Sequence, residues 1–327
     1  MADQRNQVNI PANLVPKVWA KKVWHEGVKD SYFDKFTAMD GSNVVHQNKD
    51  LENVKGDSVV FGLMMNLTGS GVEGNRQKLS GSEDTLNIYD FTVQTQLVRN
   101  AVSRFEADDQ KSQYDMLKEI KVVLKQWLSD WLDNKLINRL SYNPSNNAVL
   151  YASAAGTQSS ITANDKLTTT IISRAKRKAM MSAPKVQPIK IDGMDKYIML
   201  VSPWAARDLK DDPKWLAAQQ NANVRGSKNP IFTGALGEYD GVILYEYERV
   251  LSSGIGASSA NVCQNLLLGK QAACFAVARP AKHIEQTDDY GNVAGNGIAF
   301  YGAVEKTKFN GSDYGIINVM TGGVVER

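Results

Sequence analysis

Residues 108–141 read DDQKSQYDMLKEIKVVLKQWLSDWLDNKLINRLS, and this stretch predicts the longest regular element of the chain. Its apolar residues recur in steps of three and four, which is the spacing of one face of an α-helix. They stand at positions 117, 120, 124, 127, 128, 131, 132 and 136. At 1.5 Å per residue, such a helix would be a rod of roughly 45–50 Å. A rod of that length spans a whole domain or is kinked, and Asn143 and Pro144 would end it.

The segment before this helix, residues 56–100, predicts a β-hairpin with a long tip. GDSVVFGLMMNL at 56–67 is rich in strand-forming residues, and LNIYDFTVQTQLV at 86–98 alternates apolar with polar residues. The segment between the two runs is polar and rich in glycine. Hairpin loops usually hold 2–5 residues, and much longer loops in compact domains are usually functional or mobile. We therefore expect this loop to be functional or mobile.

The glycines of the tip also suggest a second class of function. Gly69, Gly71 and Gly74 have the G-x-G-x-x-G spacing of dinucleotide-binding loops. That motif works only where it opens a helix directly after a strand, because the helix N-terminus binds the pyrophosphate. The residues that follow, NRQKLSGSEDT at 75–85, have no apolar helical period. A soluble α/β nucleotide-binding enzyme therefore remains the alternative from a different class, and it predicts a helix immediately after Gly74.

A second charged stretch, residues 197–222, reads YIMLVSPWAARDLKDDPKWLAAQQNA. The buried strand at its start resembles a strand that delivers catalytic side chains at its end. The two pairs Ser202-Pro203 and Asp212-Pro213, however, each combine a preferred N-cap with a proline at the first helical position. We therefore expect Ser202 and Asp212 to cap two short helices. No Ser or Cys has a His base at a recognisable spacing, so we predict no catalytic residues.

Composition excludes several other kinds of site. The two cysteines, Cys263 and Cys274, lie in apolar runs and are expected to be reduced and buried. The histidines His25, His46 and His283 have no metal-ligand spacing, so we predict neither a metal nor a cofactor. The polar N-terminus has no apolar signal-peptide core, and no run approaches the ~20 apolar residues of a membrane span. We expect an intracellular or particle-assembled protein without a membrane partner.

The net charge of +3 and the isoelectric point of about 8.6 indicate at most weak contact with nucleic acid. One basic run, residues 174–178, falls on a predicted helix at 165–181 and could meet phosphate. The alternative is that these side chains form a solvated helix face. A DNA-binding protein that uses this run is the weakest of the functional hypotheses.

The order of these elements resembles that of the HK97-fold major capsid proteins of tailed bacteriophages. Three stretches of the sequence resemble the N4-like group of these proteins in particular. Two of the blocks are the stretch at 197–222 and NPIFTGALGEYDGVILYEYERV at 229–250. The third is GDSVVFGLMMNLTGSGVEGNRQKLSGSEDTLNIYDFTVQTQLVRNAV at 56–102. The resemblance covers about residues 55–325 and is weak in the first 50 residues.

The resemblance implies an α+β HK97-like fold. Its segments would be an N-terminal arm at 1–55, an extended loop at 56–100, a peripheral domain with the spine helix at 101–184, an axial domain at 185–300, and C-terminal strands returning to the peripheral domain at 301–327. It implies a structural protein, not an enzyme, that assembles as hexamers and pentamers into an icosahedral shell around double-stranded DNA. The implied partners are other copies, a portal, a possible scaffold and cement proteins. On the extended loop, the resemblance implies subunit-interface residues at Met64, Met65, Leu67, Gly69, Gly71, Gly74, Arg76 and Leu79. The apolar residues among them agree with this, because apolar side chains near a mobile tip have little of their own domain to pack on, and exposed apolar surface marks an interaction site. The implied location is the virion capsid, with the host cytoplasm during assembly. An encapsulin-type compartment of the same fold is the alternative within this class.

Overall fold

The computed structural model describes the chain from residue 31 to residue 324, with internal gaps. The described ranges are 31–52, 56–65, 67, 69, 71–74, 80–81, 83–107, 116–154, 156–191, 193–221 and 236–324. Most of the expected N-terminal arm, residues 1–55, therefore lies outside the described residues, as do Arg76 and Leu79 of the hairpin tip. Within the described ranges, no helix combines the length and the apolar character that a membrane span requires.

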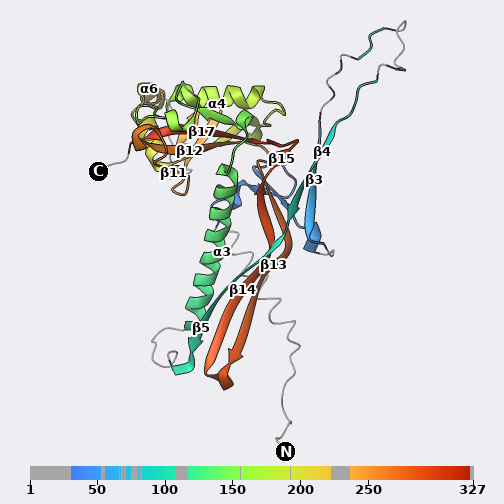
Figure 1. Cartoon of the computed structure of the whole chain (residues 1–327), viewed down its shortest axis with the longest axis vertical. Helices are drawn as coiled ribbons and strands as arrows, with labels where there is room; N and C mark the ends of the chain where they lie inside the picture. Colours follow the sequence, from blue (N-terminus) through green and yellow to red (C-terminus); the bar gives the residue numbers. More distant parts are fainter. Residues whose placement is uncertain are drawn as a thin grey trace, which may run out of the picture.

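An eight-stranded sheet, called here the head sheet, forms one end of the molecule (Figure 1). Its main path runs in the order β6 (Val149–Tyr151), β17 (Ile316–Gly323), β12 (Asn261–Leu268), β8 (Met194–Val201), β10 (Val242–Glu246) and β9 (Gly237–Tyr239). Two short strands extend it, since β7 (Ile189–Ile191) pairs with β8 and β11 (Ser252–Ser253) pairs with β12.

Both faces of the head sheet are buried, and β8 shows why. Tyr197 and Met199 pack in the cluster that holds the helices α4 (Thr169–Met181), α5 (Pro203–Lys210) and α6 (Pro213–Asn221). Ile198 and Leu200 point to the opposite face and join the cluster that contains the long helix. Successive strand residues face opposite sides of a sheet, so a strand covered on both sides reads as a continuous apolar run. The run YIMLV at 197–201 is such a strand.

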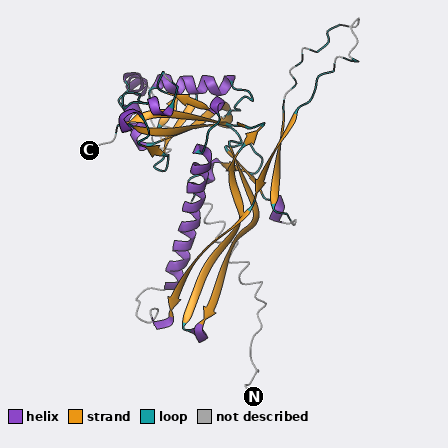
Figure 2. Ribbon diagram, in the orientation of Figure 1, coloured by secondary structure: helices purple, strands orange, loops and turns teal. Residues whose placement is uncertain are grey.

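A five-stranded sheet, called here the body sheet, runs away from the head. Its order is β1 (Thr37–Ala38), β2 (Val45–Asn48), β13 (Ala273–Asp288), β14 (Val293–Lys306) and β5 (Gln96–Phe105). The last three strands are long and antiparallel, and α3 (Met116–Ser141) lies along them (Figure 2). The body is therefore an elongated layer of one helix on one sheet.

The helix α3 confirms the helix expected from the sequence, from Met116 onward, whereas residues 108–115 lie outside the described residues. The buried side chains recur at four-residue steps: Ile120, Leu124, Leu128, Leu132 and Leu136. The 26 described helical residues form a rod of about 39 Å. The helix ends at Ser141 because Asn143 takes a left-handed φ of 40° and Pro144 follows.

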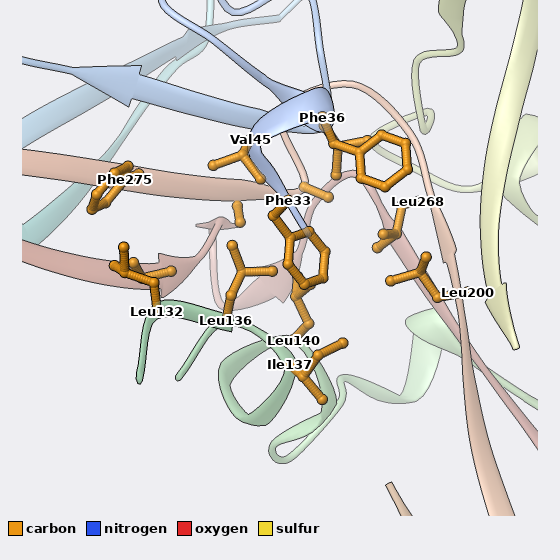
Figure 3. Close-up of a cluster of buried hydrophobic side chains, with 14 of the residues drawn as sticks. Phe33, Phe36, Val45, Leu132, Leu136, Ile137, Leu140, Leu200, Leu268 and Phe275 are labelled. Carbon is orange, nitrogen blue, oxygen red and sulfur yellow. The ribbon is translucent and has the colours of Figure 1, made fainter. Parts of the chain in front are cut away.

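Phe33 and Phe36, near the start of the described chain, pack against the head sheet, α3 and the body sheet. Figure 3 shows Phe33 beside Leu140 of α3, and Phe36 on the side of Leu200 and Leu268 of the head sheet. All of these side chains belong to one buried cluster. Burial of each large apolar side chain contributes about 1.5–3 kcal/mol, so this junction holds the two sheets in a fixed arrangement.

The predicted hairpin is present as β3 (Ser58–Met64) and β4 (Ile88–Gln94), which form a separate antiparallel sheet. The run at 86–98, which the sequence suggests is one strand, breaks at Thr95. The backbone N–H and the hydroxyl of Thr95 both donate to the Asp57 carbonyl, each at 2.8 Å. Beyond this break the chain enters β5 and pairs with β14 instead of β3. The alternating run at 86–98 therefore contributes strands to two different sheets.

The strands do not follow the expected segment boundaries. The segment 301–327 was expected to return to the part with the long helix, but β17 pairs with β12 and β6 in the head sheet. Conversely, β13 and most of β14 fall inside the expected axial segment 185–300, although they pair with each other and with β5 along α3. The helix α4 also packs on the head sheet. Alternation along a strand shows which residues are buried but not which sheet buries them.

Candidate functional site

Among the described residues, the buried contacts of the hairpin β3–β4 with the body lie at its root. Val59, Phe61 and Val93 pack against Cys274 and Ala303 of the body sheet, with neighbouring small residues. These side chains occupy the inward positions of the two strands, and the paired register Val59↔Val93 keeps them together. Past this root the hairpin projects away from the rest of the molecule (Figure 1).

The outward face of the hairpin carries an exposed apolar stripe. The exposed fractions are 62% for Val60, 64% for Met64 and 62% for Ile88. Met64 and Ile88 lie directly opposite each other in the antiparallel pairing, so their side chains form one patch. Leu67 and Leu86 extend the exposed set towards the tip. We call these five residues the hairpin stripe. Apolar residues gathered on a projecting element mark an interaction surface.

Apart from the three glycines, the predicted interface residues fall into three groups. Met64 and Leu67 lie in the hairpin stripe. Met65 is half-buried, and its N–H donates to the Asn87 carbonyl at 3.0 Å. Arg76 and Leu79 lie outside the described residues. The sequence-based set omits Val60, Leu86 and Ile88, although the two-residue period of strands places Val60 on the same face as Met64 and excludes Met65 from it.

Gly69, Gly71 and Gly74 lie in the irregular part of the hairpin tip. The Gly69 N–H donates to the Asp84 carboxylate at 2.6 Å, so that donor is already used inside the loop. Gly71 and Gly74 have φ values of 68° and 82°, a region that suits glycine. The alternative of a nucleotide-binding enzyme requires a helix directly after Gly74. The described residues between Gly74 and β4 contain no helix, and residues 75–79 lie outside the described part.

The two predicted helix caps occupy the starts of α5 and α6. The Ser202 hydroxyl accepts a hydrogen bond from the Ala205 N–H at 3.2 Å, with Pro203 as the first residue of α5. Asp212 precedes Pro213, and one carboxylate oxygen accepts from the Lys214 N–H at 3.0 Å. Both residues thus bind orphan N–H groups of a first helical turn.

Asp212 has a second task that the sequence does not show. Its other carboxylate oxygen accepts from the backbone N–H of Thr169 at 2.8 Å and from the Thr169 hydroxyl at 2.9 Å. Thr169 is the first residue of α4, whose own N-cap residue Thr168 makes no side-chain cap bond. Partial burial alone would raise the pKa of Asp212, but these hydrogen bonds and that from Lys214 lower it below its ordinary value.

A buried ion pair at the end of α3 was also missed. The Lys306 ammonium donates to the Asp313 carboxylate at 2.9 Å and to the Tyr142 carbonyl at 2.8 Å. The same carboxylate oxygen accepts from the Ser145 N–H at 2.8 Å. Burial lowers the pKa of Lys306, although Asp313 opposes that shift. A lysine at an inward position of an apolar strand is the sequence signal, since a buried charge needs a partner.

The described residues contain no candidate metal site, and their two cysteines are not activated. No group of three or more His, Cys, Asp or Glu side chains in the described ranges could hold a metal ion. Cys263 and Cys274 are buried free thiols. Burial raises the pKa of both thiols, to about 11 for Cys274, so neither is an activated nucleophile at neutral pH.

Two lysines of the basic run on α4 bind partners within the protein. The Lys176 ammonium forms an ion pair with Asp240 at 2.8 Å, and Lys178 donates to the Val149 carbonyl. Arg174 and Arg177 are exposed. Only part of the run is therefore available to phosphate, which weakens the hypothesis of a DNA-binding helix.

Comparison with known proteins gives one consistent result. Residues 12–325 match a protein family described as phage capsid protein. The major capsid protein of Pseudomonas phage KPP25 is 26% identical, over 92% of this chain and 93% of that protein.

Solved structures agree with the sequence match. The capsid of Ralstonia phage GP4 has a TM-score of 0.80 and 26% identity, over 91% of this chain and 93% of that one. The Cyanophage Pam1 capsid asymmetric unit has a TM-score of 0.80 and 22% identity, over 91% of this chain and 94% of that one. The structural similarity thus covers about nine-tenths of this chain.

Proposed function

This chain belongs to the phage capsid protein family and is a major capsid protein, and we propose that its β3–β4 hairpin joins neighbouring copies in an icosahedral shell. Its fold is the α+β HK97-like fold of the solved capsids. The family consists of structural proteins, in agreement with the prediction that the chain is not an enzyme. Membership of the N4-like group stays a prediction.

The observation that carries the proposal is the hairpin stripe. The stripe is exposed in the single subunit, and the root packing of Val59 and Phe61 leaves it facing away from the body. Covering apolar surface contributes about 25 cal/mol per Å², so a neighbouring subunit that covers the stripe would stabilise the assembly. We therefore assign the stripe, with the adjoining tip glycines Gly69, Gly71 and Gly74, to a contact between subunits.

A projecting hairpin suits ring-shaped assembly. Contacts in which one surface meets a different surface of the next copy generate closed rings when the rotation closes. A hairpin on one side of the subunit and a receiving surface elsewhere form such a contact. We propose hexamers and pentamers built in this way, with 56–100 as the extended loop, α3 and the body sheet as the peripheral part, and the head sheet as the axial part.

The remaining partners are proposals of the same kind. A closed shell must admit DNA through a portal, and a scaffold or cement proteins could guide or reinforce its assembly. The net charge of +3 fits weak, non-specific contact with enclosed double-stranded DNA. We place the protein in the virion capsid, with assembly in the host cytoplasm. The match to phage capsid proteins favours a virion over an encapsulin-type compartment.

Deletion of residues 69–84 tests the role of the hairpin. These residues carry no buried core side chain among those the structure describes, so the subunit should stay folded while particle formation is blocked or strongly reduced. Far-ultraviolet circular dichroism would report folding, and sedimentation with negative-stain imaging would report particles. The matched control is the full chain expressed alongside. Particles of normal yield from the deletion variant would refute the interface role.

A further inference from the structure

A buried histidine lies where the body sheet meets α3. His283 stands in β13 and is 4% exposed. Successive strand residues alternate between the two faces of a sheet, and Ala281, two positions earlier, belongs to the buried cluster that also holds Leu124 of α3. Ile298 of β14, which lies opposite His283 in the strand register, belongs to the same cluster. The imidazole is therefore enclosed on the α3 side of the sheet.

Polar contacts connect this imidazole to α3. Its Nδ1 lies 3.5 Å from one carboxylate oxygen of Glu285, and the same oxygen lies 3.5 Å from the Lys121 ammonium of α3. The Asn296 side chain of β14, which is 2% exposed, forms a hydrogen bond with His283. Two groups that can carry a positive charge therefore share one carboxylate oxygen.

The described charged groups around His283 are mostly cationic. On α3, Lys118 and Lys125 lie one turn before and one turn after Lys121, on the same side of the helix. β14 adds no charged side chain at this end, and the register of β5 with β14 places Arg104 on the same face of the sheet. Among the described residues of these elements, Glu285 is the one carboxylate that faces the imidazole.

The folded chain favours the neutral form of this histidine. Burial lowers the pKa of His283 below its ordinary value of 6.5, and the Lys121 ammonium lowers it further. Glu285 and the hydrogen bond with Asn296 oppose this shift without cancelling it. The unfolded chain, by contrast, binds a proton at about pH 6.5. The stability that depends on neutral His283 is therefore complete above that pH and is lost as the pH falls towards the lowered pKa.

We propose that His283 is an acid-sensitive contact whose protonation loosens α3 from the body sheet. The added proton puts a second positive charge beside the Lys121 ammonium. It also draws the Glu285 carboxylate towards the imidazolium, so the ion pair that joins sheet and helix weakens. A charge buried at an apolar interface costs free energy unless a partner compensates it, and here the one facing carboxylate is already bound by Lys121.

The loosening belongs to one end of the helix. Lys121 and the buried Ile120 lie in the first described turns of α3. The packing of Phe33 against Leu140 lies near the other end, beside the head sheet (Figure 3). Acid should therefore make the body of the subunit more deformable while the head stays packed. This effect is a property of the single subunit and does not depend on the hairpin contact.

Substitution of the histidine tests the effect in the full-length chain. His283→Gln removes the titrating group, and the glutamine amide can still bind Asn296. The urea midpoint of the natural chain should fall between about pH 7.5 and about pH 5, and in His283→Gln this acid-induced fall should shrink by about half or more. An equal fall in the two proteins would overturn the proposal.

The two ion-pair partners give a second test that leaves His283 in place. Glu285→Gln removes the carboxylate that favours the imidazolium, so the acid-induced fall should grow, whereas Lys121→Gln removes the opposing ammonium, so the fall should shrink. Both variants break the same ion pair, and a merely structural role predicts the same change in both. Changes in the same direction would overturn the proposal. The control is Lys176→Gln, which breaks a 2.8 Å ion pair with Asp240 in the head and should keep the natural fall.

Hydrogen exchange of the full-length chain locates the opening. Exchange rates, corrected for the intrinsic effect of pH, should rise severalfold in acid for peptides that cover residues 117–125 and should stay constant for peptides from α4. His283→Gln should lack the rise. A rise of equal size in α4 would mean global unfolding instead of a local release and would overturn the proposal, as would constant exchange at 117–125 in the natural chain.

Discussion

Asp212 illustrates how one side chain can bind two helix starts. Its two carboxylate oxygens accept from Lys214 at the start of α6 and from Thr169 at the start of α4. Each helix leaves N–H groups without intrahelical partners in its first turn, and a carboxylate there is favoured by the helix dipole as well. The residue therefore joins two elements that are 43 positions apart in the chain.

Asp212→Ala should reduce the free energy of unfolding by about 1–2 kcal/mol, because the N–H groups of two helices lose their acceptor. The matched control is Asp211→Ala at the adjacent exposed residue, which should change stability by less than about 0.5 kcal/mol. Urea unfolding of the purified chain measures both. Equal losses from the two variants would show that the carboxylate of Asp212 has no special role.

The effect of Asp212 should depend on pH in one direction. Its pKa is lowered in the folded chain from an ordinary value of 3.8, so the folded state favours the charged form. The stabilisation is therefore complete above about pH 4 and is lost as the pH falls through the lowered pKa. Unfolding measured between neutral and acidic pH should show the difference between Asp212→Ala and the natural chain shrinking in acid. A difference that grows in acid would contradict this.

At the scale of elements, α3 separates a buried face from an exposed one. Leu124 is 1% exposed and packs in the cluster shared with the head and body sheets, whereas the adjacent Val123 is 58% exposed. Leu124→Ala should cost about 2–5 kcal/mol of unfolding free energy through the cavity that it leaves. Val123→Ala should change it by less than about 0.5 kcal/mol.

Val123→Ala is the control for Leu124→Ala, since the two residues are adjacent on α3. Thermal or urea unfolding measures the stability of both variants. A loss of several kcal/mol from Val123→Ala would mean that the outer face of α3 is packed in the isolated chain. A selective loss of particle yield from Val123→Ala, with unchanged unfolding, would instead show that a neighbouring copy covers this face.

At the scale of the whole molecule, folding and assembly use different apolar surfaces. The subunit core is closed without the hairpin stripe, so Met64→Lys with Ile88→Lys should leave the subunit folded. In the shell the same lysines would be buried without partners, which costs several kcal/mol per contact and should lower particle yield by more than about tenfold. Sedimentation of the expressed protein measures this yield.

The control for that experiment is Gln94→Lys, which adds a lysine at an exposed position near the root of the same hairpin. It should leave particle yield within about twofold of the natural chain, since Gln94 is polar and is not one of the five apolar residues of the stripe. Normal particles from the Met64 and Ile88 variant would remove the stripe from the interface.

The sequence by itself determined the local structure. Periodicity identified α3 and the strands β3 and β8, and cap–proline pairs identified the starts of α5 and α6. These features depend on backbone geometry and on side chains a few residues apart, so their causes are written in the neighbouring residues. The resemblance of the quoted blocks added the fold and the capsid function, and the family match confirms both.

Only the tertiary structure decided which distant segments meet. It paired β17 with the head sheet, broke the run at Thr95 between two sheets, and brought Thr169 to Asp212. It also placed Lys306 against Asp313 and Lys121 against Glu285. These contacts depend on how whole elements pack, and packing is a property of three-dimensional shape and burial that no local period of the sequence encodes.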